Sequence, residues 1–173
     1  MTVMKKRFLI GNVPIGDGSV SIQSLTNVPF TRFEELKAQA LALEKEGCRI
    51  IRASVPDRLS AEWFADLKKA ISAPLVADIH FDYRLALASI EAGADKIRIN
   101  PGNIGSEHIK EVARAAYEKN VPIRVGVNAG SLEKELLAKF GHPCAEALAL
   151  SAHNNVRLLE KCGFENIVVS MKA

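Results

Sequence analysis

The chain has 173 residues, of which 48% are apolar and 25% are charged, and its formal net charge is +3. These values are ordinary for a globular protein, so they argue against a disordered chain, a fibrous repeat or the densely basic surface of a nucleic-acid-binding domain. No apolar run approaches the ~20 residues that span a bilayer. We therefore expect a cytoplasmic protein that binds neither nucleic acid nor membrane.

The three cysteines, Cys48, Cys144 and Cys162, are odd in number and far apart. There is no Cys-x-x-Cys pair, and no histidine lies at a ligand spacing from a cysteine. This usage predicts neither a disulfide framework nor a zinc site, and it is typical of a reducing compartment. We expect no metal site in this chain.

Strand-like and helix-like segments alternate along the chain. Residues 8–18 are predicted to form a hairpin, because Gly and Asp supply the turn positions. The predicted strands that follow are residues 20–24, 49–54, 75–79, 96–100, 123–127 and 167–171. The predicted helices between them are residues 33–44, 59–71, 83–91, 108–119 and 145–161. This order is typical of βαβ units with a parallel sheet.

Two architectures fit such a chain: an open doubly wound sheet and a (β/α)8 barrel of the TIM type. The doubly wound sheet usually carries a Gly-rich phosphate loop after its first strand, and residues 23–27, Gln-Ser-Leu-Thr-Asn, are not one. A complete barrel needs eight strands and ~250 residues. We therefore predict an incomplete α/β TIM barrel of about six βα units, preceded by a hairpin, in one domain over residues 1–173.

Polar residues recur at the ends of the predicted strands. In a strand, residues i and i+2 share a face, so the polar residues at each strand end point the same way. They are Arg52 with Ser54, Asp78 with His80, Arg98 with Asn100, Arg124 with Gly126 and Asn128, and Ser170 with Lys172. A buried charge is costly, and in a barrel all these ends converge at the C-terminal mouth, where active sites lie.

The cations outnumber the acids at this mouth. Arg52, Arg98, Arg124 and Lys172 accompany a single strand-end acid, Asp78, which predicts an anionic ligand such as a phosphate or diphosphate.

The other polar residues at the mouth have supporting roles to play in this prediction. His80 and Asp78 are candidates for proton handling or hydroxyl recognition. Asn100 and Asn128 offer amide donors, and Gly126 removes bulk so that a ligand can approach. Structural alternatives stay open, since Asp78 can simply pair with Arg52 or Arg98.

Two further segments carry weaker signals. Residues 100–105, Asn-Pro-Gly-Asn-Ile-Gly, are predicted to be a loop whose backbone N–H groups could hold a phosphate. Residues 133–135, Glu-Lys-Glu, are predicted to be a solvated helix start.

Five sequence blocks resemble one enzyme family. They are residues 13–18 (VPIGDG), 23–27 (QSLTN), 76–84 (VADIHFDYR), 98–105 (RINPGNIG) and 126–134 (GVNAGSLEK). They resemble the 4-hydroxy-3-methylbut-2-en-1-yl diphosphate synthases, the iron–sulfur enzymes of the methylerythritol phosphate route to isoprenoids.

The resemblance implies a TIM barrel followed by a smaller domain that carries a [4Fe–4S] cluster. It implies reductive ring opening of 2-C-methyl-D-erythritol 2,4-cyclodiphosphate to the allylic diphosphate, electrons from ferredoxin or flavodoxin, and a homodimer. By motif match it assigns substrate binding to Arg52, Arg98, Asn100, Arg124 and Lys172. It assigns catalytic contacts to Asp78, His80 and Asn128.

The chain departs from that family in its cysteines. The family holds its cluster with three cysteines, two of them in a Cys-x-x-Cys, and a glutamate, and Cys48, Cys144 and Cys162 do not match these ligands. We therefore expect the cluster domain to be absent from these residues and the chain alone to be inactive. One alternative is a barrel that binds a phosphosugar or diphosphate without redox chemistry. A second, weaker alternative is a relative of pteridine-binding barrels, which the arginines disfavour because they suit a diphosphate.

Overall fold

The structure, a computed structural model, describes residues 8–172. Its strands are β1 (Phe8–Ile10), β2 (Val13–Ile15), β3 (Gln23–Leu25), β4 (Ile50–Ser54), β5 (Leu75–Asp78), β6 (Lys96–Ile99), β7 (Ile123–Asn128) and β8 (Ile167–Lys172). Its helices are α1 (Phe33–Lys45), α2 (Arg58–Ala70), α3 (Tyr83–Glu91), α4 (Pro101–Ile104), α5 (Ser106–Glu118), α6 (Lys134–Phe140) and α7 (Ala145–Lys161). All five predicted helices are present, within a few residues of their expected ends.

The six strands β3 to β8 form one parallel sheet in the order of the chain. A doubly wound sheet reverses its strand order at a switch point, whereas a barrel adds each strand beside the last. The unbroken order therefore confirms the barrel type that the sequence predicts. The hairpin is also confirmed, because β1 and β2 pair antiparallel.

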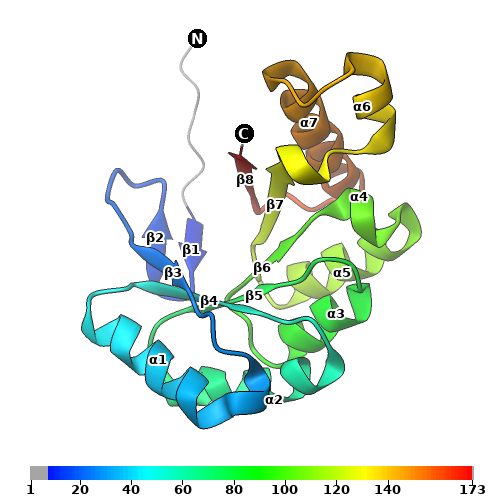
Figure 1. Cartoon of the computed structure of the whole chain (residues 1–173). Coiled ribbons are helices and arrows are strands. Elements are labelled where there is room, and N and C mark those ends of the chain that lie inside the picture. Colours follow the sequence, from blue (N-terminus) through cyan, green and yellow to red (C-terminus); the bar gives the residue numbers. More distant parts are fainter. Residues whose placement is uncertain (1–7, 173) are drawn as a thin grey trace.

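One face of the sheet packs against the helices. Alternate strand residues such as Ile51, Leu75, Ile97 and Val125 are fully buried there. The helices contribute the other half of this core, with Leu36 of α1, Phe64 and Leu67 of α2, Val112 of α5 and Leu159 of α7. Figure 1 shows the helices arranged along this side of the curved sheet. We call this the outer face of the sheet.

The β1–β2 hairpin lies on the opposite, inner face. Ile10 and Val13 of the hairpin form a second small core with Ile50 of β4 and Val76 of β5. Figure 1 shows the hairpin on the side of the sheet away from helices α1 and α2. A Cβ at Gly11, in the hairpin turn, would lie only 2.8 Å from Pro74 Cγ, so a glycine is required for this close approach. The hairpin thus covers the inner face near the N-terminal ends of the strands.

Two features differ from the prediction: the start of the first barrel strand and the segment after β6. The first barrel strand begins at Gln23 instead of residue 20, and the apolar residues Val20 and Ile22 before it are 88% and 58% exposed. The segment predicted as a loop after β6 contains the one-turn helix α4, since proline is well suited to a first helical position. Helix α6 begins at Lys134, within the helix start predicted at residues 133–135. Gly105, with φ of 90°, separates α4 from α5.

Candidate anion-binding site

The strand register places the predicted polar residues on the inner face. Residues paired across parallel strands point to the same side of a sheet. Asp78 of β5 pairs with Arg98 of β6, and Arg98 pairs with Arg124 of β7. These three side chains therefore form a row across neighbouring strands, on the face opposite the helices. Arg52 of β4 pairs with Val76, two residues before Asp78, and so points to the same face.

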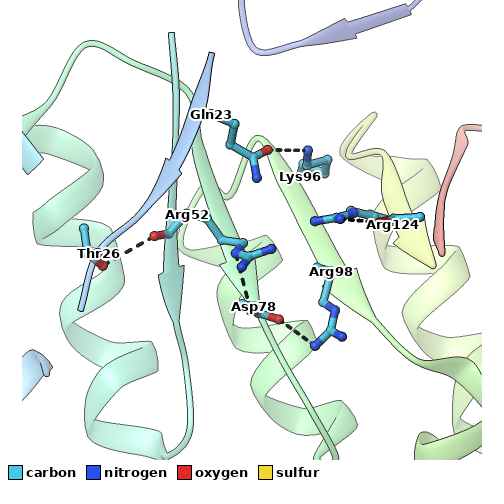
Figure 2. Close-up of polar contacts among 8 residues, drawn as sticks. Gln23, Thr26, Arg52, Asp78, Lys96, Arg98 and Arg124 are labelled. Atoms are coloured by element: carbon cyan, nitrogen blue, oxygen red, sulfur yellow. Dashed lines mark hydrogen bonds and ion pairs between the residues drawn. The ribbon is translucent and has the colours of Figure 1, made fainter. Parts of the chain in front are cut away.

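Asp78 lies between two guanidinium groups. Its Oδ1 is 3.0 Å from Arg98 Nη1 and accepts a hydrogen bond from it, and its Oδ2 is 3.5 Å from Arg52 Nε. The Asp78 side chain is only 7% exposed, and those of Arg98 and Arg52 are 13% and 22% exposed. Figure 2 shows the carboxylate bridging the two arginines. Asp78 thus pairs with both Arg52 and Arg98, the structural alternative left open by the sequence. We call Arg52, Asp78, Arg98 and Arg124 the arginine cluster.

Arg124 joins the cluster from the other side. Its Nη2 donates a hydrogen bond to Ser170 Oγ of β8 at 2.6 Å. Burial lowers the pKa of Arg124, and the nearby charges of Arg52 and Arg98 lower it further, although Asp78 opposes them. An arginine stays protonated in proteins, so the cost appears as repulsion between fixed charges. An anion bound here would relieve that repulsion.

Lys96 is a further cation on this face that the sequence reasoning missed. It lies two residues before Arg98 on β6, it is 4% exposed, and its Nζ donates a hydrogen bond to Gln23 Oε1 of β3 at 3.0 Å (Figure 2). Burial, followed by the charges of Arg124 and Arg52, lowers the pKa of Lys96 to about 8. The i, i+2 parity that selected Arg98 also applies to Lys96, the first residue of the predicted strand 96–100, but only the C-terminal strand ends were considered as site residues.

Gly126 makes room for an arginine instead of a ligand. A Cβ at this position would lie 2.7 Å from Arg98 Nε and 3.0 Å from Arg98 Nη2. The expectation that the missing side chain lets a ligand approach is therefore replaced by a different reason. The glycine lets the Arg98 guanidinium pack closely against β7 while its Nη1 donates a hydrogen bond to Asp78.

The remaining predicted residues lie at the C-terminal ends of the strands. His80 follows β5 and is exposed, with its ring centroid 6.1 Å from that of Phe81. Asn100 directly follows β6 and is 6% exposed. Asn128 and Lys172 end β7 and β8 and are paired in register, with Lys172 exposed. Their place at the mouth is as expected, and their roles in binding or catalysis stay predictions.

The cysteines do not fit an iron–sulfur cluster. Within residues 8–172, no group of three or more His, Cys, Asp or Glu side chains is placed to hold a metal ion. Cys144 and Cys162 flank the 17-residue helix α7, which is about 25 Å long. Cys48 is a free cysteine beyond the end of α1. We assign no metal ligand to these three residues.

A family model described as the GcpE TIM-barrel domain matches residues 5–173. This chain belongs to that family. The chain is 55% identical over 174 residues to the 4-hydroxy-3-methylbut-2-en-1-yl diphosphate synthase (flavodoxin) of Caldanaerobacter subterraneus subsp. tengcongensis, covering 99% of this chain and 49% of that protein. It is 52% identical over 166 residues to the protein of the same name from Anoxybacillus flavithermus, covering 95% and 46%. The chain thus spans about half the length of the curated relatives it matches.

Solved structures confirm the barrel fold of this GcpE family member. A dihydropteroate synthase from Xanthomonas albilineans superposes with a TM-score of 0.69 at 15% identity, covering 95% of this chain and 64% of that one. A phospho-2-dehydro-3-deoxyheptonate aldolase from Thermotoga maritima superposes with a TM-score of 0.61 at 17% identity, covering 95% and 45%. At such low identity these likenesses concern the fold alone. None of the helices within residues 8–172 has the length and apolar character needed to cross a bilayer.

Proposed function

We propose that this chain is the substrate-binding barrel portion of a 4-hydroxy-3-methylbut-2-en-1-yl diphosphate synthase. The whole protein would open the ring of 2-C-methyl-D-erythritol 2,4-cyclodiphosphate reductively, in isoprenoid biosynthesis. One observation carries the proposal: three arginines and a lysine converge on the inner face around a single carboxylate, Asp78, within the described residues. The name shared by relatives at 52–55% identity supports the same substrate class.

The arginines bind the diphosphate in this proposal. Guanidinium groups suit phosphate oxygens because their N–H donors form a planar fork. Asp78 fixes the orientation of Arg52 and Arg98, so these two groups are organised before the ligand arrives. Arg124 is held by a neutral hydroxyl, Ser170, and therefore keeps its full charge for the ligand. Asn100 and Lys172, nearer the mouth, complete the proposed binding set.

The catalytic roles fall to residues at the strand ends. Ring opening with loss of water needs a proton at the leaving oxygen, and His80 is exposed at the mouth where it can deliver one. Asn128, at the end of β7, would orient the sugar hydroxyls. Asp78 has both oxygens next to arginines, so its contribution to catalysis is to hold the cations and to keep their charge balanced.

The electrons for this reaction come from outside the described residues. We assign the donor as flavodoxin, one of the two that the sequence blocks imply, because the relatives carry that word in their names. The [4Fe–4S] cluster of the proposed enzyme would be held by residues other than Cys48, Cys144 and Cys162. For the complete protein we further propose a cytoplasmic homodimer.

Calorimetry of the chain with the cyclodiphosphate tests the proposal. Arg124→Ala removes a charged donor from the cluster and is expected to weaken binding about tenfold or more, since a hydrogen bond to a charged group is worth about 1.5–3 kcal/mol. Arg114→Ala is the matched control, because Arg114 lies on α5, pairs with Glu118 and is 80% exposed. Equal binding by the wild type and by Arg124→Ala would contradict the site. An anaerobic assay with a strong reductant is expected to give no product from the chain alone.

A further inference from the structure

Lys96 is a buried cation that is not among the residues proposed to contact the ligand. Its side chain is 4% exposed and lies on the inner face, two residues closer to the N-terminal end of β6 than Arg98. The hairpin closes this end, through Ile10 and Val13 packed on Ile50 and Val76. Lys96 therefore lies at the N-terminal side of the arginine cluster, between the cluster and the hairpin.

The charges around Lys96 are mostly positive. Arg52 of β4 and Arg124 of β7 both act on it unfavourably, and Arg98 follows it on its own strand. The inner-face acid Asp78 of β5 is shared by Arg52 and Arg98.

The remaining polar neighbours do not balance this charge. The adjacent Asp95 binds Lys68 Nζ at 2.6 Å and the backbone N–H of Leu75 at 2.7 Å. From β3 comes the neutral amide of Gln23, at 3.0 Å from Nζ. Within residues 8–172, Lys96 thus has a neutral hydrogen-bond acceptor and no carboxylate partner.

Lys96, unlike the arginines beside it, can change its charge near neutral pH. The arginines stay protonated throughout the accessible range. Burial and the neighbouring cations bring the pKa of Lys96 to about 8, so near pH 8 the protonated and neutral forms are both populated. A polyanion placed among the arginines would favour the protonated form by direct attraction.

We propose that Lys96 takes up a proton when a polyanion binds to the arginine cluster, so that ligand binding and protonation of Lys96 are linked. The Nζ lone pair accepts the proton from solvent water, and release of the ligand returns it. The linkage is reciprocal: protonation strengthens anion binding by the same factor by which the anion strengthens proton binding. This inference rests on the proposed anion site, and it adds that anion binding depends on pH through Lys96, a residue outside the arginine cluster.

The experiment measures the titration of Lys96 directly, by NMR of the full chain with 13C-labelled lysine. Sodium sulfate is the probe, because sulfate stays a dianion above neutral pH and any proton taken up belongs to the protein. Sodium chloride at equal ionic strength controls for screening. Lys96→Met, which has a similar length and no charge, identifies the Lys96 signal by its loss. The exposed Lys69 provides an internal reference.

The expected midpoint for Lys96 is about 8 in chloride and about 9 or higher in saturating sulfate, with Lys69 unmoved. Sulfate binding that leaves the Lys96 midpoint in place would overturn the linkage while leaving the anion site intact. A Lys96 midpoint near the ordinary lysine value of 10.5 in chloride would also overturn it. Failure of sulfate to bind at all would instead contradict the proposed function, and the linkage with it.

Gln23→Glu provides a second, independent readout. It puts a carboxylate beside Nζ and is expected to keep Lys96 protonated throughout this range. In the wild type, sulfate affinity should fall about five- to tenfold between pH 7 and pH 9.5, as linkage requires for a midpoint that moves by this amount. In Gln23→Glu and in Lys96→Met the affinity should be nearly constant over the same range. An unchanged pH dependence in both variants would contradict the proposal.

Discussion

The two faces of the six-stranded sheet are built from the same strands but differ in chemistry: the outer face is apolar, and the inner face of β4 to β7 carries buried charges. Ile97 and Ile99 of β6 lie in the helix-packed core, whereas Lys96 and Arg98, each one residue away, carry buried charge on the inner face. The outer face stabilises the fold by burying apolar surface, at about 25 cal/mol per Å². The inner face holds charges whose burial is costly unless each is paired. The apolar outer face thus stabilises strands whose inner face carries costly buried charges, and those charges are where we expect an anion to bind.

Asp78→Ala gives the strongest test of this difference. It leaves the half-buried guanidiniums of Arg52 and Arg98 without their carboxylate, and removal of one partner from a buried pair costs about 3–5 kcal/mol. Urea unfolding measures the loss. Glu62→Ala is the control, because Glu62 pairs with Arg58 on the surface, and its loss should cost less than about 1 kcal/mol. Equal losses in the two variants would show that the inner face is not under electrostatic strain.

Lys96→Met tests how much the buried charge of Lys96 destabilises the fold, through the pH dependence of the free energy of unfolding. The pKa of Lys96 is lowered to about 8 in the folded chain, from an ordinary value of 10.5. The unfolded state therefore binds more protons between these values, so the stability of the wild type should rise with pH across this interval. The gain in the free energy of unfolding relative to pH 7 should be on the order of 2–3 kcal/mol.

In Lys96→Met this contribution disappears. The variant should be more stable than the wild type at pH 7, and the two should approach each other by pH 10.5. Urea midpoints at several pH values measure the difference, in which groups common to both proteins cancel. Parallel curves for the two proteins would contradict the account of Lys96.

Gly126→Ala sharpens the comparison at a smaller scale. The added methyl would lie 2.7 Å from Arg98 Nε, so the guanidinium must move away from Asp78. Overpacking of this kind costs about 1–3 kcal/mol, and anion binding should weaken with it. Gly130→Ala is the control, because a Cβ there meets no atom within 4 Å. If Gly126→Ala behaved like Gly130→Ala in both stability and binding, the close fit of Arg98 against β7 would be disproved.

Much of this molecule was predictable because parallel strands impose simple parity. The helix-facing isoleucines and valines fix the outer face, and residues one position away must then face inward, which selected Arg52, Asp78, Arg98 and Arg124. The glycines Gly47, Gly93 and Gly163, which follow α1, α3 and α7, each have positive φ, as is common just after a helix end. The sequence blocks in turn identified the family that the GcpE TIM-barrel match confirms.

The failures have tertiary causes. Glu133 was predicted to be solvated, but its Oε1 accepts hydrogen bonds from Ser151 and Asn155 of α7, contacts that no local pattern encodes. Lys96 shares the parity of Arg98, but it lies at the N-terminal end of its strand, and its burial and its hydrogen bond to Gln23 of β3 depend on tertiary packing. The role of Gly126 depends on the rotamer of Arg98 on a neighbouring strand.

A crystal structure of the chain grown with 2-C-methyl-D-erythritol 2,4-cyclodiphosphate tests the central claim most directly. We predict electron density for the diphosphate on the inner face, in contact with the guanidiniums of Arg98 and Arg124. A surface hollow of about 600 Å³ between α2 and α3 offers a different location, lined by Arg58 and Arg84 but also by Glu62, Asp82 and Glu91. Density there, with the inner face empty of ligand, would contradict the assignment of the arginine cluster as the binding site.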